Sequence, residues 1–250
     1  MSTWILLRGL TREVRHWGDF PQSLQAALPD AEIHAIELPG AGRLHMVKSP
    51  TTIDAIAVHC RNQVLAQGLR PPFHILAMSL GAMVAAAWAN AHPEELAGCV
   101  LINTSLRPFS PFHHRLRPSA YAALSRLLLP MADRMREAVI LHLTSSRAAE
   151  LAEVLDAWVT YRREQPVTLS NTLRQLFAAM RYQAPATRPA VRLLVLTGSR
   201  DMLVDPECSS RLAKDWQADY AEHPGAGHDL PLDDGEWVVQ QISRWLKSLA

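Results

Sequence analysis

The fold of this chain is decided by residues 73–84, which read FHILAMSLGAMV. The first half is a short, almost wholly apolar run, which is typical of a strand buried on both faces. The second half favours a helix, so that Ser79 alone separates the two elements. Such a tight strand-to-helix turn holds its central residue in a strained conformation, and small residues such as Ala77 and Gly81 let neighbouring chains pass. We therefore expect the Ser79 side chain to stand exposed at this turn.

Two interpretations of Ser79 follow from its position. Small hydroxyl side chains often cap helix N-termini, which would make Ser79 a purely structural residue. Alternatively, Ser79 is a nucleophile, because the first helical residue, Leu80, has a backbone N–H that can hydrogen-bond a developing oxyanion. The A-x-S-x-G pattern arises by chance in many sequences, so the remainder of the chain must decide.

Elsewhere, short apolar runs alternate with longer helical patterns, which favours an α/β fold with a mostly parallel sheet and helices on both faces. Because the second expected strand contains Glu32, His34 and Glu37, we place it at an edge of the sheet. The expected strands span residues 4–7, 32–38, 73–78, 99–103, 191–197 and 219–222.

The helices of this alternation have recognisable ends. Thr51 and Asp54 form a capping box for a helix that ends near Gly68. A second helix, from Leu80 to His92, must stop before Pro93. The other two run from Pro206 to about Trp216 and from Asp233 or Asp234 onward, the last with Trp237, Ile242, Trp245 and Leu249 on one side.

Residues 106–185 interrupt the alternation, because they contain helical patterns but no convincing strand. We therefore divide the chain into an α/β core of residues 1–105 and 186–250 and a helical insertion of residues 106–185. The insertion carries eleven Arg, no Lys and six Asp or Glu residues. This positive charge is either a solvated helical surface or a rim that favours substrates with an anionic group, for which Arg115 and Arg117 are candidates. The expected helices span residues 121–129, 133–143, 147–163 and 171–182.

Two further polar residues follow predicted strands at the edge where parallel sheets build their sites. Asp201 lies in the loop that follows the strand 191–197, and His228 lies on a glycine-rich loop before the last helix. Asp205 competes with Asp201 for an acidic role, although it can instead cap the helix that begins at Pro206. Chain order is therefore Ser79, Asp201, His228.

This order resembles that of the catalytic triad of the α/β-hydrolase superfamily, and the likeness covers nearly the whole chain. Residues 38–43 (LPGAGR) are similar to a family loop, and Gly9 matches the glycine of its oxyanion turn. The resemblance implies an α/β-hydrolase fold with about six parallel strands, and a lid formed by residues 106–185. Arg8 and Ala77 depart from the family, which has a histidine and a glycine at these positions.

These residue types predict a serine hydrolase that cleaves a carboxylic ester, or a thioester, of a small molecule without a cofactor. Ser79 would attack the acyl carbonyl while His228 takes its proton, and Asp201 would orient and stabilise the imidazolium. The backbone N–H groups of Leu10 and Leu80 would hold the oxyanion, each worth about 3–4 kcal/mol. The alternative is a catalytically weak hydrolase-fold protein that binds a small ligand or partner, which the departures at Arg8 and Ala77 would favour.

Composition argues against several other functions. Lys and Arg number 25 and Asp and Glu 24, a balance that does not suit a nucleic-acid partner. The three cysteines are odd in number and unpaired, and no histidines have metal-ligand spacing, so neither disulfides nor a metal site are expected. With no signal-peptide pattern and no apolar stretch long enough to cross a bilayer, we expect a cytoplasmic protein.

Several charged residues near these motifs are most simply predicted to be solvated. Arg12, Glu13 and Arg15 follow the oxyanion turn and form either an exposed loop or the border of an entrance. Asp229 is predicted to lie in a solvated loop, and Asp233 with Asp234 at an exposed helix start.

Overall fold

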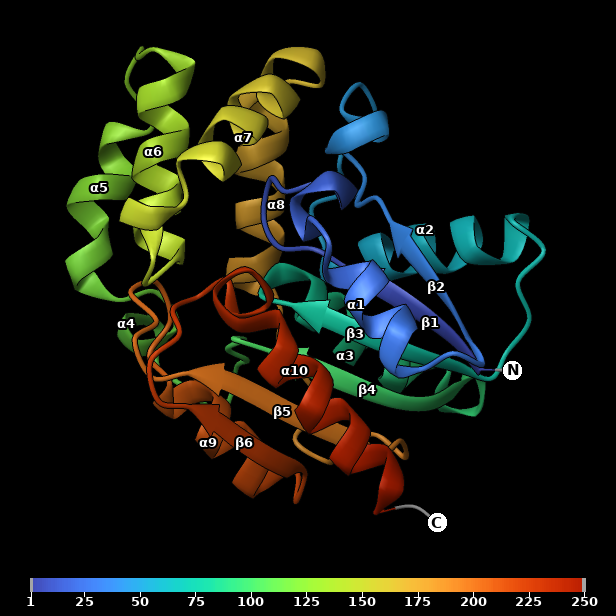
Figure 1. Cartoon of the computed structure of the whole chain (residues 1–250). Coiled ribbons are helices and arrows are strands. Elements are labelled where there is room, and N and C mark those ends of the chain that lie inside the picture. The colour runs from blue at the N-terminus through green and yellow to red at the C-terminus, as the bar shows by residue number, and fades with distance from the viewer. Residues whose placement is uncertain (1, 249–250) are drawn as a thin grey trace.

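The computed structural model describes residues 2–248 and contains one parallel sheet (Figure 1). The strands follow the order β2-β1-β3-β4-β5-β6, and every neighbouring pair is parallel. The α/β-hydrolase fold predicted from the sequence is thereby confirmed, and the carboxyl ends of all six strands meet at one edge. The strands are β1 (Ser2–Leu7), β2 (Ala31–Ile36), β3 (Phe73–Met78), β4 (Leu96–Ile102), β5 (Leu193–Gly198) and β6 (Asp219–His223).

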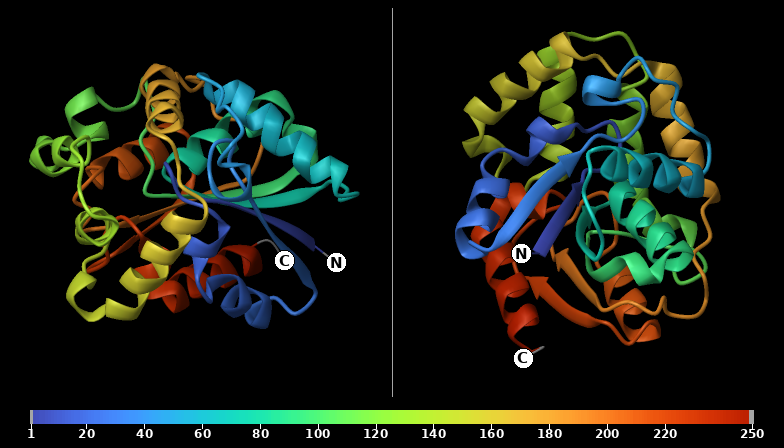
Figure 2. Two further views of the ribbon diagram at one scale, coloured as in Figure 1. Left: turned by 90° about the horizontal axis from the view of Figure 1, so that it is seen from above. Right: turned by 90° about the vertical axis from the view of Figure 1, so that its right-hand side faces the viewer.

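Successive side chains of a strand point to opposite faces of the sheet, and different helices bury them. On β1, Ile5 and Leu7 belong to one apolar cluster, whereas Trp4 and Leu6 belong to the other. The first cluster is covered by α2 (Ile53–Ala66), α3 (Leu80–Ala91) and α9 (Glu207–Asp215). The second is covered by α1 (Phe20–Ala27) and α10 (Leu230–Lys247), which lie side by side on the opposite face (Figures 1 and 2).

Between β4 and β5 the chain forms a helical insertion, and no strand occurs within residues 106–185. Only an isolated bridge joins Arg107 and Gln183. The helices gather at the end of the sheet toward which β3 and β5 point (Figure 1). That the insertion acts as a lid stays a prediction. Its helices are α4 (Phe112–Arg115), α5 (Tyr121–Arg126), α6 (Asp133–Thr144), α7 (Ala152–Glu164) and α8 (Leu169–Arg181).

Short 3-10 segments complete the described elements. Among residues 2–248, no helix combines the length and the apolar character needed to cross a bilayer. The 3-10 segments are Val14–Trp17, Gly42–Leu44, Pro93–Glu95, Pro118–Ala120 and Ala148–Glu150.

The two edges of the sheet are polar. As the sequence predicted, β2 lies at one edge, with Glu32 exposed and His34 half-buried. The other edge, β6, exposes Asp219 and Glu222. Both outer strands thus combine a partly apolar inner surface with charged outward side chains.

One predicted helix start is wrong. The cap of α2 is Thr52, whose hydroxyl accepts a hydrogen bond from Ala55 N–H (3.3 Å), and not Thr51. In α10 a first helical segment from Leu230, with a proline in its first turn, precedes a non-helical kink at Asp234 (φ −153°). The longer part of α10 follows this kink, and Asp234 caps it as the sequence predicted, by accepting the Trp237 N–H (2.9 Å). Of its expected apolar side, Leu249 lies outside the described residues.

Candidate active site

Ser79 occupies the turn between β3 and α3, with φ 53° and ψ −117°. A positive φ is uncommon for a residue other than glycine, so neighbouring contacts must hold it. The Ser79 N–H donates to the Ile102 carbonyl of β4 (2.9 Å), and the Thr104 hydroxyl donates to the Ser79 carbonyl (3.2 Å). The Ser79 side chain makes no capping hydrogen bond, so its interpretation as a structural helix cap is not supported.

The residues on either side of Ser79 differ in how much space they have. A Cβ on Gly81 would lie 2.5 Å from the carbonyl oxygens of Leu7 and Arg8, so only glycine fits where α3 passes the end of β1. Ala77 is fully buried, and the turn forms with its methyl group in place. The departure from glycine at position 77 is therefore tolerated.

Asp201 and His228 form a buried hydrogen-bonded pair. His228 Nδ1 lies 2.6 Å from Asp201 Oδ2. The second carboxylate oxygen of Asp201 accepts the backbone N–H groups of Leu203 (2.8 Å) and Val204 (2.9 Å). Asp205 instead accepts the backbone N–H of Glu207 (3.0 Å) at the start of α9, which leaves Asp201 as the residue paired with the imidazole.

The surroundings of His228 favour its charged form. Burial opposes a charged imidazolium, but the charge and hydrogen bond of Asp201, with a contribution from Asp229, raise the pKa of His228 above its ordinary value. The Asp201 contact at Nδ1 also fixes the orientation of the ring. In the neutral imidazole a proton on Nδ1 leaves Nε2 as the acceptor.

Ser79 and His228 both line a cavity of about 810 Å³ between the sheet edge and the insertion. Leu10 and Leu80, the residues expected to supply oxyanion donors, line the same cavity. Within residues 2–248 the Ser79 hydroxyl makes no hydrogen bond, and such contacts often tighten only when substrate binds. The serine, the imidazole and both expected donor residues thus line one cavity.

Asn103 holds the histidine loop and was missed by the sequence analysis. Its side-chain amide donates to the carbonyls of Gly227 (3.0 Å) and His228 (2.6 Å). Its side-chain oxygen accepts from the Thr197 hydroxyl and the Gly198 N–H (both 2.9 Å) at the end of β5. Asn103 therefore fixes the base loop relative to the strand that carries Asp201. An asparagine directly after a buried strand was the available signal, since its φ of 46° suits this residue type.

The turn after β1 approaches Ser79 closely. A Cβ on Gly9 would lie 3.2 Å from the Ser79 Cβ. The Thr11 N–H donates to the side-chain oxygen of Gln175 on α8 (3.0 Å), and the Gln175 amide donates to the Pro39 carbonyl (3.0 Å). Gln175 is fully buried, so the insertion itself holds the turn that carries Leu10.

The sequence match agrees with this architecture. Residues 4–241 match the profile of the alpha/beta hydrolase family. The chain belongs to this family. A comparison with curated protein sequences finds no significant match.

Among solved hydrolase-fold structures, the chain is similar to an esterase from Rhodococcus sp. ECU1013, with 17% identity and a TM-score of 0.77 over 100% of this chain and 91% of that chain. A thermophilic esterase from Thermogutta terrifontis has 22% identity and a TM-score of 0.75 over 99% and 90% of the two chains. A hydrolase from Pseudomonas aeruginosa PA01 has 17% identity and a TM-score of 0.78 over 98% and 89%. At these identities the likeness shows the fold.

Arg8 forms a buried ion pair with Asp229. Two guanidinium nitrogens lie 3.1 Å and 2.5 Å from the two carboxylate oxygens, and both side chains are almost fully enclosed. The guanidinium also lies over the Trp17 ring, 4.8 Å from its centre. The prediction that Asp229 lies in a solvated loop is wrong, because its charge is needed to balance Arg8. The pair joins the oxyanion turn of this hydrolase-family chain to the residue after His228.

Asp233 is also buried, contrary to the prediction of an exposed helix start. Its carboxylate accepts from the Ser145 hydroxyl (2.5 Å), the Ser146 N–H and hydroxyl (both 3.0 Å) and the Gly227 N–H (2.6 Å). It therefore joins the end of α6 to the histidine loop. Asp234 is partly exposed and accepts from the Trp237 N–H, which caps the continuing helix.

Arg12 and Glu13 are buried as well, and both line the cavity, so the exposed-loop prediction is wrong for them. Arg12 pairs with Glu137 of α6 (2.8 Å) and lies over the Trp158 ring of α7 at 4.2 Å. Burial, then the charges of Arg12 and Arg8, hold the pKa of the adjacent His16 well below its ordinary value. The segment after the oxyanion turn is therefore a contact between core and insertion.

Arg15 is partly exposed and bridges two carboxylates. It pairs with Glu13 (2.7 Å) and contacts Glu164 of α7. The guanidinium lies 4.3 Å from the centre of the Tyr161 ring. Arg15 therefore adds a second, outer contact between the core and the insertion.

Glu37, which directly follows β2, is a buried carboxyl with an unusual environment. Burial, with repulsion from Glu13, raises the pKa of Glu37 to about 7. A Cβ on Gly42 would lie 2.0 Å from one carboxyl oxygen, so the glycine-containing loop wraps around this side chain. The Val14 N–H donates to the other oxygen (3.2 Å).

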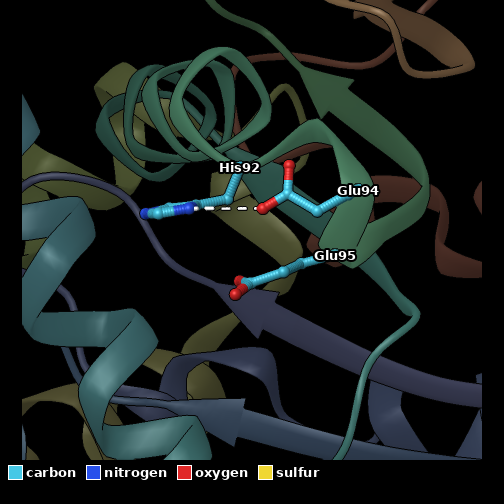
Figure 3. A group of neighbouring side chains, drawn as sticks. All are labelled: His92, Glu94 and Glu95. Carbon is cyan, nitrogen blue, oxygen red and sulfur yellow. Dashed lines mark ion pairs between the residues drawn. The ribbon is translucent and has the colours of Figure 1, made fainter.

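Two clusters of histidine and carboxylate groups in the described part of the chain have the spacing to hold a metal ion, and neither lines the cavity. In the first, His92 faces Glu94 (3.5 Å), with Glu95 beside them (Figure 3). The Glu95 carboxylate already accepts from Arg61 (2.9 Å) and from the Trp88 indole (2.9 Å), so a cation there would have to displace a guanidinium. The second cluster comprises His114, Asp205 and Glu207.

Proposed function

We propose that this protein is a serine hydrolase that cleaves a carboxylic ester, or less favourably a thioester, of a small molecule. The observation that carries the proposal is the 2.6 Å contact between His228 and Asp201 at a cavity that also contains the strained Ser79. A serine hydroxyl is a poor nucleophile until a base accepts its proton, and His228 supplies that base. Membership of the hydrolase family supports the same reaction class.

The reaction proceeds through an acyl-enzyme. Ser79 Oγ attacks the acyl carbonyl while His228 Nε2 takes its proton, and the Asp201 carboxylate stabilises the resulting imidazolium. The backbone N–H groups of Leu80 and Leu10 donate to the tetrahedral oxyanion. His228 then protonates the leaving alcohol, and water, deprotonated by the same imidazole, hydrolyses the acyl-enzyme. This scheme needs no cofactor or metal.

The raised pKa of His228 sets the pH dependence of this reaction. A protonated imidazole cannot accept the serine proton, so the rate should rise with pH through a pKa above 6.5. Asp229→Asn removes one charge that raises this pKa and should move the rise to lower pH. A kcat/KM profile of p-nitrophenyl acetate hydrolysis between pH 5 and 9 measures both. A rise that does not depend on Asp229 would contradict this assignment.

Labelling with a fluorophosphonate probe tests the nucleophile directly. The native protein should be labelled and should hydrolyse p-nitrophenyl acetate, whereas Ser79→Ala should lose labelling and about 10³-fold or more of the turnover. Ser125→Ala is the matched control, because Ser125 lines the same cavity but its hydroxyl donates to Ala122 of its own helix. Labelling that persists in Ser79→Ala would refute the role of Ser79.

The second candidate function is a hydrolase-fold protein that binds a small ligand and barely turns over. The observation that favours it is Arg8, whose side chain is committed to Asp229 where the family has a histidine. Folded protein that is neither labelled nor active on any ester of a short series would support this alternative.

We place the protein in the cytoplasm. Cys60, Cys99 and Cys208 are free and buried, which suits a reducing compartment.

A further inference from the structure

We propose that the cavity takes a large apolar group of the ester, such as an aliphatic chain, between the α5 and α8 sides of the insertion. This inference rests on the proposed function, because it places that group beside Ser79. The cavity volume of about 810 Å³ falls in the range that encloses drug-sized ligands. An acetyl group would leave nearly all of it unfilled.

The two walls of the cavity are apolar and have no protein covering them. Leu128, on the α5 side, is 62% exposed, and on α8 Leu173 is 48% and Met180 45% exposed. Positions 173, 176 and 180 follow helical spacing, so they form one stripe along α8. An apolar ligand laid along this stripe would remove the surface from water. The wall residues that carry this argument are Leu124, Leu127, Leu128, Leu173, Leu176 and Met180.

Of the five arginines that line the cavity, three are paired with carboxylates, whereas Arg115 and Arg136 bond only carbonyl groups and have no carboxylate partner in the described part of the chain. Each one is already bonded to a group of the protein among residues 2–248: Arg8 to Asp229, Arg12 to Glu137, Arg115 to the Ala179 carbonyl, Arg136 to the Leu129 carbonyl and Arg162 to Asp133.

The buried nitrogens of these side chains that have no partner within the described residues are Nε of Arg8, Nη2 of Arg12 and Nε of Arg115. The preference for an apolar chain therefore rests on the walls of the cavity and not on its arginines.

A series of p-nitrophenyl esters from acetate to decanoate tests the chain-length preference. Each buried CH₂ group is worth up to about fourfold in kcat/KM, so octanoate should exceed acetate by at least tenfold. Acetate hydrolysis with a flat or falling series would overturn the inference while leaving the proposed function intact.

Two variants on α8 test whether this helix is responsible for the chain-length preference. Leu173→Asp should lower the octanoate-to-acetate ratio of kcat/KM at least tenfold. Phe177→Asp is the matched control, because Phe177 lies on the same helix with a similar exposure but does not line the cavity with Ser79. The Phe177 variant should keep the ratio within twofold. Equal octanoate-to-acetate ratios in the two variants would overturn the placement of the apolar group along α8.

Binding to Ser79→Ala separates this inference from the proposed function, because it needs no turnover. The fluorescent apolar probe N-phenyl-1-naphthylamine should bind to this variant and be displaced by 1-decanol. Failure of the probe to bind would overturn the apolar site even if Ser79 is active. Binding without any esterase activity would support the site and count against the hydrolase.

Discussion

On the sheet side of the cavity Asp201, His228 and Asp229 are at most 5% exposed and each is bonded to a partner, whereas on the insertion side Leu128 is 62% and Leu173 48% exposed. The sheet side is held by charge-assisted hydrogen bonds, which fix a geometry. The insertion side leaves apolar side chains exposed. Substitutions on the sheet side should therefore lower the stability of the protein, whereas substitutions on the insertion side should alter its substrate preference.

The α8 helix has one face that hydrogen-bonds the core and one face that is apolar and exposed. One face sends Gln175 and Asn171 into the core, where they bond the loops near Pro39 and Ser49. The opposite face carries Leu173 and the rest of the apolar stripe. By contrast, α5 contains no buried residue. The cavity thus has one wall anchored in the α/β core and one wall that packs loosely.

The largest effect is expected from Asp229→Ala. Removing this carboxylate leaves the Arg8 charge buried and unpaired, which should lower the free energy of unfolding by about 3–5 kcal/mol. Asp156→Ala, which breaks an exposed pair with Arg134 in the insertion, should cost at most about 1 kcal/mol. Urea unfolding measures both. Equal losses would break the contrast between the two sides.

A double variant refines this test. Arg8→Met with Asp229→Leu removes both charges and should recover a large part of the stability lost by Asp229→Ala. If the double variant is no more stable than the single one, the unpaired charge is not the cause of the loss.

Glu37→Gln should give an effect that depends on pH. Because the native pKa of about 7 lies above the ordinary value of 4.5, the native state holds this proton more tightly than the unfolded state. The stabilisation is complete below pH 4.5 and is lost as the pH rises through 7, a change of about 3 kcal/mol at most.

The Gln variant lacks this titration, so its stability relative to the native protein should rise between pH 5 and 8. Unfolding free energies of the native protein and the Gln variant, measured at pH 5 and pH 8, test this prediction. A difference between the two proteins that does not change with pH would contradict the raised pKa of Glu37.

Gln175→Leu should cost about 1–3 kcal/mol, because the Thr11 N–H and the Pro39 carbonyl lose their partner. The same change should lower kcat, since the turn that carries Leu10 is no longer held. Gln165→Leu is a fair control, because its side-chain oxygen is buried without a partner. A Gln175 variant with native kcat would show that α8 does not position the turn.

The smallest stability effect is expected from Leu128→Ser on the loosely packed wall. An exposed side chain away from packed contacts contributes within about 0.5 kcal/mol, so thermal unfolding should be nearly unchanged. Amide hydrogen exchange should likewise be faster in α5 than in α8. Slower exchange in α5 would break the contrast between the walls.

The sequence alone predicted the elements whose patterns are local. The strand at Phe73–Met78 was predicted with its observed bounds, because a wholly apolar run that ends at a small turn residue leaves little choice of register. The cap of α2 was misplaced by one residue, because Thr51 and Thr52 are chemically identical in the sequence.

The candidate site was predicted only in part, for a physical reason. Ser79, Asp201 and His228 each follow or precede a recognisable element, so their places at the sheet edge could be predicted. Asp229 pairs with Arg8 across 221 positions, and no local pattern reports such a distant charge. The sequence around a buried charged residue does not differ from that around an exposed one, so the structure is needed to tell them apart.

The acidic outer strands of the sheet have a consequence for how copies of this protein meet. A strand at an edge has unpaired N–H and C=O groups that can recruit another chain into a continuous ribbon. Pairing two β6 edges would bring Asp219 and Glu222 of one molecule against the same carboxylates of the next. Repulsion between these like charges guards the folded enzyme against aggregation through its sheet.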